Sequence, residues 1–272
     1  MTKSIPLVLS LMYIVDCSVS QGSVLGALKF ITHTEDVPVV IEKRNIAHHL
    51  YADNGQLSDH PSIATVPASI NNLEICVHEV HNRCTSKCLQ LNPNKAEVIW
   101  FGTADRLRKS KTIDLDLHVK SDSISPVSVV RDLRVLINSE LAMKQHVNKT
   151  VSICYYQIRR LNQVRRILGP DIAARLVSAY IISILDYCNF VLAGLTQKTI
   201  APLQRVQNAA ARLISSLGPR DHITSTLRDL HWPQVKYRVQ YQLCLMMHTV
   251  YIERSPRYIS ELVTATASLL SR

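Results

Sequence analysis

Glycine is scarce in this sequence, with 7 residues in 272 where an average chain has about 7%. The glycine-rich phosphate loops G-x-G-x-x-G and G-x-x-x-x-G-K-[ST] are both missing, which argues against domains that bind phosphates through such loops. Long apolar runs are missing too, since residues 5–15 and 176–185 fall short of the ~18 residues of a membrane span. We therefore expect no membrane span in this chain.

The cysteines lack the spacing of a disulfide framework. There are seven, an odd number, and they are spread through a chain long enough to fold without disulfides. Reduced thiols and an intracellular location, in the nucleus or the cytoplasm, are the prediction. An alternative stays open, because Lys3, the apolar residues 5–15 and the small residues Ser18 and Ser20 have the outline of a secretory signal over residues 1–20.

Acidic residues are rare in the second half of the chain. Residues 1–142 hold 14 Lys and Arg and 15 Asp and Glu, a net charge of −1. Residues 143–272 hold 17 and 6, a net charge of +11, so this half carries the whole excess of +10. One strongly basic half is typical of a protein that binds a polyanion, most often nucleic acid.

The hydrophobic pattern of the first half alternates between strand and helix. Short apolar runs predict strands over residues 37–41, 46–50, 96–101, 113–119 and 133–137. Asn54-Gly55 follows one of them and predicts a hairpin turn. A helix is expected over residues 70–89, and charged residues 106–111 and the Pro126 region over 121–128 are expected to be loops.

From Met143 onward the period is helical. Apolar residues recur at steps of three and four, and Gly169-Pro170 predicts the end of one helix and the start of the next. Two more helices are predicted over 197–217 and 234–252. The expected fold class is therefore α+β, with a mixed domain over residues 1–142 and a basic helical bundle over 143–272.

Arginine is concentrated on the polar positions of these helices. Its guanidinium suits bidentate contact with phosphate, so the series predicts a track for a nucleic-acid backbone, although a charged helix face is often simply solvated. The residues that we expect to form this track are Arg159, Arg160, Arg165, Arg166, Arg205 and Arg212.

The predicted helix over 70–89 also carries ligand-type side chains. Cys76 lies on it, and His78, His81, Cys84 and Cys88 recur at steps of three and four near one helical face. Zinc sites normally draw ligands from two elements, and four ligands on one straight helix do not readily form a tetrahedron. We therefore do not predict zinc here.

Two segments are the most specific in the sequence: Ser20-Gln21-Gly22-Ser23-Val24-Leu25-Gly26 and Tyr51-Ala52-Asp53-Asn54. They resemble the reverse transcriptase of LINE-type, non-LTR retrotransposons, whose members carry a Pro-Gln-Gly-Ser-Val-Leu-Gly stretch and then a Tyr-Ala-Asp-Asp hairpin. Further segments resemble that family in the same order, at residues 91–102, 130–133, 185–189 and 203–212. The resemblance covers most of the chain, from about Asp16 to Val263.

The resemblance implies part of a polymerase palm followed by a thumb-like helical region that contacts an RNA–DNA duplex. In the family, two Mg²⁺ ions held by aspartates activate the primer hydroxyl and stabilise the leaving pyrophosphate. By resemblance Asp53 is a metal ligand and Lys95 lies near the triphosphate. Gln21, Gly22 and Tyr51 would contact nucleotide and template.

The departures from the family concern the metal ligands. Asn54 stands where the family has the second aspartate, and its oxygen lacks the charge that Mg²⁺ favours. The family's upstream aspartate has no counterpart before Gln21, where Asp16 alone is present. We therefore expect a remnant that does not polymerise and binds nucleic acid through its basic half. The alternatives are an active or trans-complemented reverse transcriptase, and an interaction module without a nucleic-acid ligand.

Overall fold

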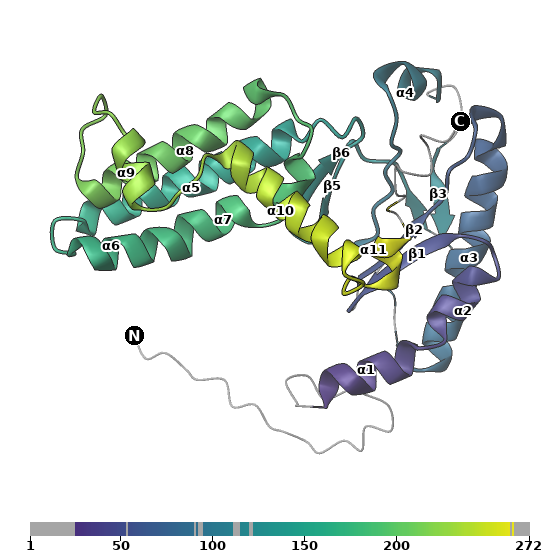
Figure 1. Cartoon of the computed structure of the whole chain (residues 1–272). Helices are drawn as coiled ribbons and strands as arrows, with labels where there is room; N and C mark the ends of the chain where they lie inside the picture. The colour runs from purple at the N-terminus through teal and green to yellow at the C-terminus, as the bar shows by residue number, and fades with distance from the viewer. Residues whose placement is uncertain are drawn as a thin grey trace, which may run out of the picture. The chain divides into compact units, whose positions relative to one another are not determined.

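The computed structural model describes residues 25–52, 54–89, 91, 95–110, 115–119, 122–261 and 263 (Figure 1). The chain separates into two compact units, Met1–Ser128 and Val129–Arg272, which are described one at a time. Within the described part of the chain, no helix combines the length and the apolar character needed to cross a membrane. The predicted mixture of helices and strands is confirmed, with the strands in small antiparallel sheets.

The N-terminal unit combines helices with two hairpins. Its elements are α1 (Gly26–Thr34), α2 (Val37–Glu42), β1 (Ala47–Tyr51), β2 (Asn54–Ser58), the 3₁₀ turn η1 (Ile63–Thr65), α3 (Val66–Ser86), α4 (Ala104–Ser110), β3 (Leu117–Val119) and β4 (Asp122–Ile124).

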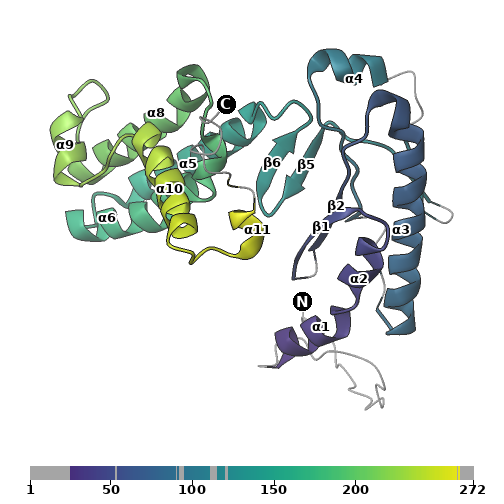
Figure 2. The ribbon, with the colours of Figure 1, turned by 45° about the vertical axis from the view of Figure 1, so that its right-hand side comes forward.

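Helix α3 organises the N-terminal unit, with α2 and β1–β2 beside it in Figure 2. It follows a Ser62–Thr65 capping box and has proline in its first turn. It ends at Ser86 because Cys88 takes a left-handed backbone conformation (φ 57°). The expected helix over 70–89 is confirmed with shifted ends. Its buried face packs on α2 and on the residue before β1, and the core side chains are Val37, Ile41, Ile46, Cys76 and Cys84.

The predicted hairpin is present, but its turn lies earlier than expected. Tyr51 pairs with Asn54, so the turn comes before Asn54, and Ala52 has a positive φ of 52°. The register pairs half-buried Leu57 with half-buried His48. Leu57 packs on the core, and this register, rather than the Asn-Gly preference, sets the position of the turn.

Four local predictions for the N-terminal unit were wrong. Residues 37–41 belong to helix α2, because Pro38 in its first turn presets a helical φ and Val37 and Ile41, one turn apart, both reach the core. Residues 96–101 form no strand; Val98 only accepts a single backbone hydrogen bond, from Val127 at 2.8 Å. The expected charged loop over 106–111 is largely helix α4, and β4 lies in the expected loop over 121–128.

The C-terminal unit is a helical bundle with one hairpin. Its elements are β5 (Val129–Asp132), β6 (Val135–Asn138), α5 (Lys144–Val164), α6 (Pro170–Val177), the π turn η3 (Ser178–Ile182), α7 (Ser183–Asp186), the 3₁₀ turn η4 (Asn189–Leu192), α8 (Gln197–Ser215), α9 (Thr224–Asp229), α10 (Val235–Tyr251) and α11 (Arg257–Ser260).

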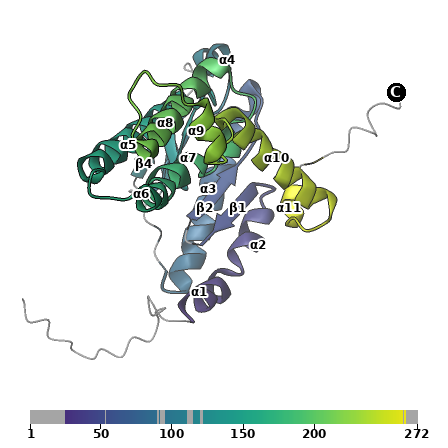
Figure 3. The same ribbon diagram turned by 60° about the vertical axis from the view of Figure 1, so that its left-hand side comes forward.

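Helices α5, α6 and α8 lie side by side in this unit (Figure 3). The apolar stripe of α5 includes Val147 and Cys154, and that of α8 includes Leu203 and Val206; all four are at most 2% exposed. The predictions of helices from 143, 170, 197 and 234 are confirmed. The strand expected over 133–137 is confirmed only from Val135, where β6 begins, because Leu133 and Arg134 form the turn between β5 and β6 with positive φ. The β5–β6 hairpin belongs to this unit, and β6 contacts α5.

Candidate nucleic-acid interface

The residues predicted from the polymerase motif are only partly described. Asp53, Gln21 and Gly22 lie outside the described residues, as does the segment 1–20 that has the outline of a secretory signal. Tyr51 and Asn54 are a cross-strand pair at the end of the β1–β2 hairpin, and both are exposed.

Lys95 is also exposed, and it lies well along the chain from the hairpin, after helix α3. The structure therefore places Tyr51 beside Asn54.

The carboxylates of the described residues do not form a Mg²⁺ site. Among these residues no three His, Cys, Asp or Glu side chains are arranged to hold a metal ion. At the hairpin the described candidate is Asn54, whose amide oxygen is a neutral ligand and by itself too weak a partner for a hard dication. The described residues therefore do not fit the metal pair that the resemblance implies.

The ligand-type side chains of α3 serve other contacts. Cys76 and Cys84 are buried in the core, where burial raises the pKa of both thiols. His78 shares a hydrogen bond of 3.2 Å with Asn82, and His81 contacts Thr85 one turn later. These side chains stabilise the helix and its packing.

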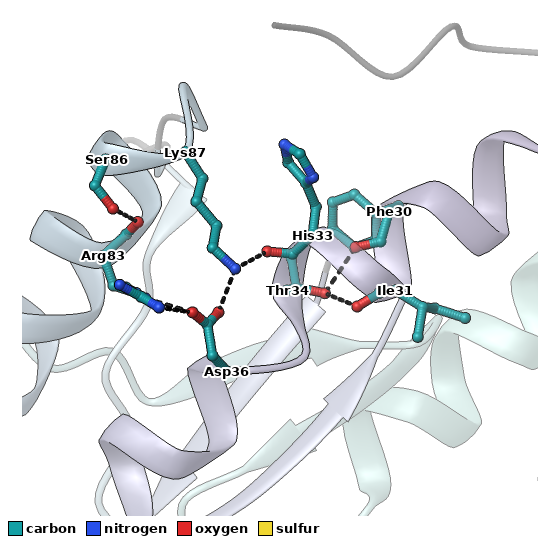
Figure 4. A network of polar contacts seen from close by, with 8 residues as sticks. All are labelled: Phe30, Ile31, His33, Thr34, Asp36, Arg83, Ser86 and Lys87. Carbon is teal, nitrogen blue, oxygen red and sulfur yellow. Dashed lines mark hydrogen bonds and ion pairs between the residues drawn. The ribbon is translucent and has the colours of Figure 1, made fainter.

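Two ion pairs hold α2 against the end of α3 (Figure 4). The Asp36 carboxylate accepts a hydrogen bond from Lys87 Nζ at 2.7 Å and pairs with Arg83, while Lys87 also donates to the carbonyl of His33 at 2.8 Å. Hydrogen bonding to Lys87, more than to Arg83, holds the Asp36 pKa below its ordinary value. In this unit cations are thus used to join helices.

On α5 and just after its end, three of the predicted arginines are available to a ligand. Arg159, Arg160 and Arg166 are exposed, and none of them makes an ion pair within the described residues. The guanidinium of Arg160 lies over the ring of Tyr156, 5.7 Å from its centre. This stacking orients the side chain on the helix surface while leaving its N–H donors available.

Arg165 has a structural contact instead. Its Nε donates to the carbonyl of Leu213 at 2.7 Å and its Nη2 to that of Ile214 at 2.6 Å, both in the last turn of α8. Its Nη1 donates to the carbonyl of Leu168, three residues later, at 2.8 Å. A cation is favourable beside the unpaired carbonyls at a helix C-terminus. The side chain that was predicted to contact phosphate therefore joins α5 to α8.

Helix α8 presents a second basic line opposite its buried face. Lys198, Arg205 and Arg212 are spaced by seven residues, which is about two helical turns. Lys198 and Arg205 are exposed, whereas Arg212 is half-buried and donates to the carbonyl of Asp221 at 3.3 Å. Sequence reasoning missed Lys198, although the seven-residue spacing could have identified it.

A cavity of about 220 Å³ lies beside α10 in the same unit. Its wall includes the ion pair between Asp186 and Arg238 and the buried side chain of Asn189. Asp186 and Asn189 belong to the family-like segment 185–189, but nothing in the sequence joined that segment to Arg238, which is 52 residues from Asp186.

Comparisons with known proteins give no family for this chain. No protein-family model, curated protein or solved structure matches it.

Proposed function

We propose that this chain is a remnant of a LINE-type reverse transcriptase that does not polymerise DNA and that binds nucleic acid through its C-terminal unit. The observation that carries the binding part is the basic surface of α5 and α8. Arg159, Arg160, Arg166 and Arg205 are exposed there without an acidic partner among the described residues. The family part rests on the ordered motifs of the sequence.

Charge supports the choice of a polyanionic ligand. Val129–Arg272 contains 19 Lys and Arg but 8 Asp and Glu, a net charge of +11. Two of those acids already pair with arginines, Asp186 with Arg238 and Glu261 with Arg257. The exposed guanidiniums are therefore free to displace counterions from phosphates, which gives an affinity that depends steeply on salt.

The binding experiment measures fluorescence anisotropy of a labelled RNA–DNA duplex over a series of salt concentrations. We expect tight binding at low salt, and the slope of log K against log salt to fall by about 0.9 for each phosphate contact removed. The test variant is Arg159→Ala/Arg160→Ala/Arg205→Ala. The matched control is Arg108→Ala, an exposed arginine of the nearly neutral unit that pairs with Asp105. An unchanged slope in the triple variant would show that α5 and α8 are not the interface.

The polymerase part is tested by primer extension with Mg²⁺ or Mn²⁺. We expect no extension by the natural chain, because Asn54 supplies no charge and groups that act as a unit fail together. Asn54→Asp is expected to remain inactive as well, since it does not supply the upstream aspartate. A known reverse transcriptase in the same buffer is the positive control. Extension by the natural chain would favour the alternative of an active enzyme.

A further inference from the structure

Helix α10 carries a row of exposed side chains on the side that faces away from the core. Tyr237, Tyr241, Cys244, His248 and Tyr251 follow one another at steps of four, three, four and three residues, so they share one helical face. All five are exposed, and the three tyrosines are 55%, 65% and 86% exposed in chain order. The opposite side of the helix contributes valines to the core of the unit. We call these five exposed side chains the tyrosine row.

The charge around the row favours a polyanion as its occupant. The helix Val235–Tyr251 contains no Asp or Glu, and Lys236 is exposed directly before Tyr237. The unit to which the helix belongs has a net charge of +11. A second copy of this chain would bring two such units together, and like charges across an interface are unfavourable. A chain of phosphates is complementary to the same surface.

The row begins where α10 packs on α8, the helix that carries the basic line (Figure 2). The Val235 N–H donates to Gln204 Oε1 at 2.9 Å, which joins the first turn of α10 to the middle of α8. Gln204 is followed by the exposed Arg205, and Val235 lies two residues before Tyr237. The first ring of the row therefore lies near a cation of the proposed phosphate-binding surface, and a bound strand can continue from α8 onto α10.

We propose that the tyrosine row binds single-stranded nucleic acid, whose unpaired bases stack on Tyr237, Tyr241 and Tyr251 while its phosphates contact Lys236 and Arg205. Aromatic rings beside cations are the usual platform for an unpaired strand, because every base has a face on which a ring can stack. In a duplex those faces are covered by the neighbouring base pairs. The inference rests on the proposed function and names an unpaired strand as a ligand of the same unit.

The length of the row suits several nucleotides. A helix rises about 1.5 Å per residue, so Tyr237 and Tyr251 lie about 21 Å apart along the axis of α10. Nucleotides of one strand follow at about 3.4 Å when their bases are stacked. We therefore expect short oligonucleotides to bind more weakly than one that reaches both ends of the row.

The test measures the fluorescence anisotropy of a labelled oligothymidylate of about 20 nucleotides with the full chain. The matched control ligand is a strand of the same length in which abasic sites replace the thymines, so that every phosphate stays and the bases are removed. We expect the abasic strand to bind at least about fivefold more weakly, because it has nothing to stack on the rings. Equal affinity for the two strands would overturn the proposal.

Substitutions of the rings test the residues. Tyr237→Ala, Tyr241→Ala and Tyr251→Ala are each expected to weaken binding of the oligothymidylate at least about fivefold and to leave binding of the RNA–DNA duplex unchanged. Tyr241→Phe keeps the ring and is expected to retain the affinity. The matched control is Tyr180→Ala, which removes a tyrosine of η3 that is 51% exposed. Circular dichroism verifies the fold of each variant, and unchanged affinity in all three row variants would overturn the proposal.

The basic-surface variant Arg159→Ala/Arg160→Ala/Arg205→Ala separates this inference from the proposed function. We expect it to weaken binding of both ligands, whereas the tyrosine variants weaken binding of the single strand alone. Duplex binding that depends on the arginines, together with single-strand binding that ignores the tyrosines, would overturn the row and leave the phosphate surface standing. Sedimentation velocity without nucleic acid is expected to show no dimer that depends on the row. A dimer that Tyr241→Ala dissociates would assign the row to a second copy and overturn the proposal.

Discussion

The two units of this chain differ in how they are held together. Among the described residues, one cluster of 17 buried side chains forms the core of Val129–Arg272, drawn from the β5–β6 hairpin, five helices and the two turns η3 and η4. The corresponding cluster of Met1–Ser128 has five members around α3. Burial of apolar surface is the main source of stability, so the C-terminal unit has much the larger reserve.

The two units also differ in how they use their charged residues. In the N-terminal unit Arg44 pairs with Glu79, and Arg83 and Lys87 pair with Asp36, so cations connect α3 to the segments packed on it. In the C-terminal unit most cations stay on the surface without such partners. A unit with a large apolar core can leave its arginines available for a ligand, whereas a unit with a small core uses them for its own fold.

The largest expected effect comes from the C-terminal core. Leu203 on α8 is 1% exposed, so Leu203→Ala removes buried methyl groups and leaves a cavity. We expect the free energy of unfolding of this unit to fall by about 2–5 kcal/mol, measured by urea denaturation. Arg205→Ala, on the exposed side of the same helix, is the control and should change it by less than about 0.5 kcal/mol. A small effect of Leu203→Ala would mean that the core is loosely packed.

The second expected effect concerns Arg165, the arginine that behaves like those of the N-terminal unit. Arg165→Ala leaves the carbonyls of Leu213 and Ile214 without their donor, which should cost about 1.5–3 kcal/mol of stability. Its neighbour Arg166 is exposed, and Arg166→Ala should cost little stability but weaken duplex binding. Thermal unfolding measures the stability of the two variants, and fluorescence anisotropy measures their affinity for the duplex. The reverse pattern would place Arg165 in the interface.

The third effect is a pH dependence of the C-terminal unit. His146 is buried on α5, and burial lowers its pKa from the ordinary value of 6.5. Its Nδ1 accepts from the Leu136 N–H at 3.3 Å, which requires the neutral ring. The unfolded chain therefore binds a proton at higher pH than the folded one, so stability is full above pH 6.5 and declines as the pH falls below it.

His146→Gln removes this titration and keeps an acceptor near Leu136. We expect the free energy of unfolding of the variant to change less than that of the natural chain between pH 7 and pH 5. His222, His231 and His248 are exposed, so their substitution should leave the natural pH dependence in place. A profile unaffected by His146→Gln would assign the dependence to another group.

The smallest effect is expected from the ion pairs of the N-terminal unit. Asp36→Asn removes the charge that pairs with Arg83 and Lys87, and we expect a loss below about 1 kcal/mol because the site is close to solvent. Since the Asp36 pKa is lowered in the folded unit, this contribution is present above the unfolded pKa of about 3.8 and is lost as the pH falls through the folded value. Added salt should reduce the difference between Asp36→Asn and the natural chain.

The sequence predicted the long helices well because their apolar residues recur over several turns. It failed for residues 37–41, where a run of β-branched residues indicated a strand although Pro38 and the core contacts of Val37 and Ile41 favour a short helix. The hairpin turn was misplaced because the local Asn-Gly preference was outweighed by the register of Leu57. Short elements depend on tertiary contacts that a local pattern does not contain.

The candidate sites, too, were predicted where a local pattern carries them and missed where tertiary contacts decide. Charge asymmetry and helical spacing indicated the exposed arginines of α5 and α8. Arg165 was grouped with them, although it lies four residues after Leu161 and seven after Ile158, on the stripe that faces the core. The cavity beside α10 could not be predicted, because its lining residues come from segments that only the packing of α10 on η4 brings together.

In two of the hairpins, a backbone N–H donates a hydrogen bond to the side chain of a helix residue. The His118 N–H on β3 donates to Glu74 Oε1 at 2.7 Å, as the Leu136 N–H on β6 donates to His146. An amide bonded in this way is not available to an incoming strand, so at these positions a helix side chain prevents edge-to-edge polymerisation of the ribbons. Glu74 and His146 thus each occupy one backbone donor of a hairpin, a contact quite separate from any ligand.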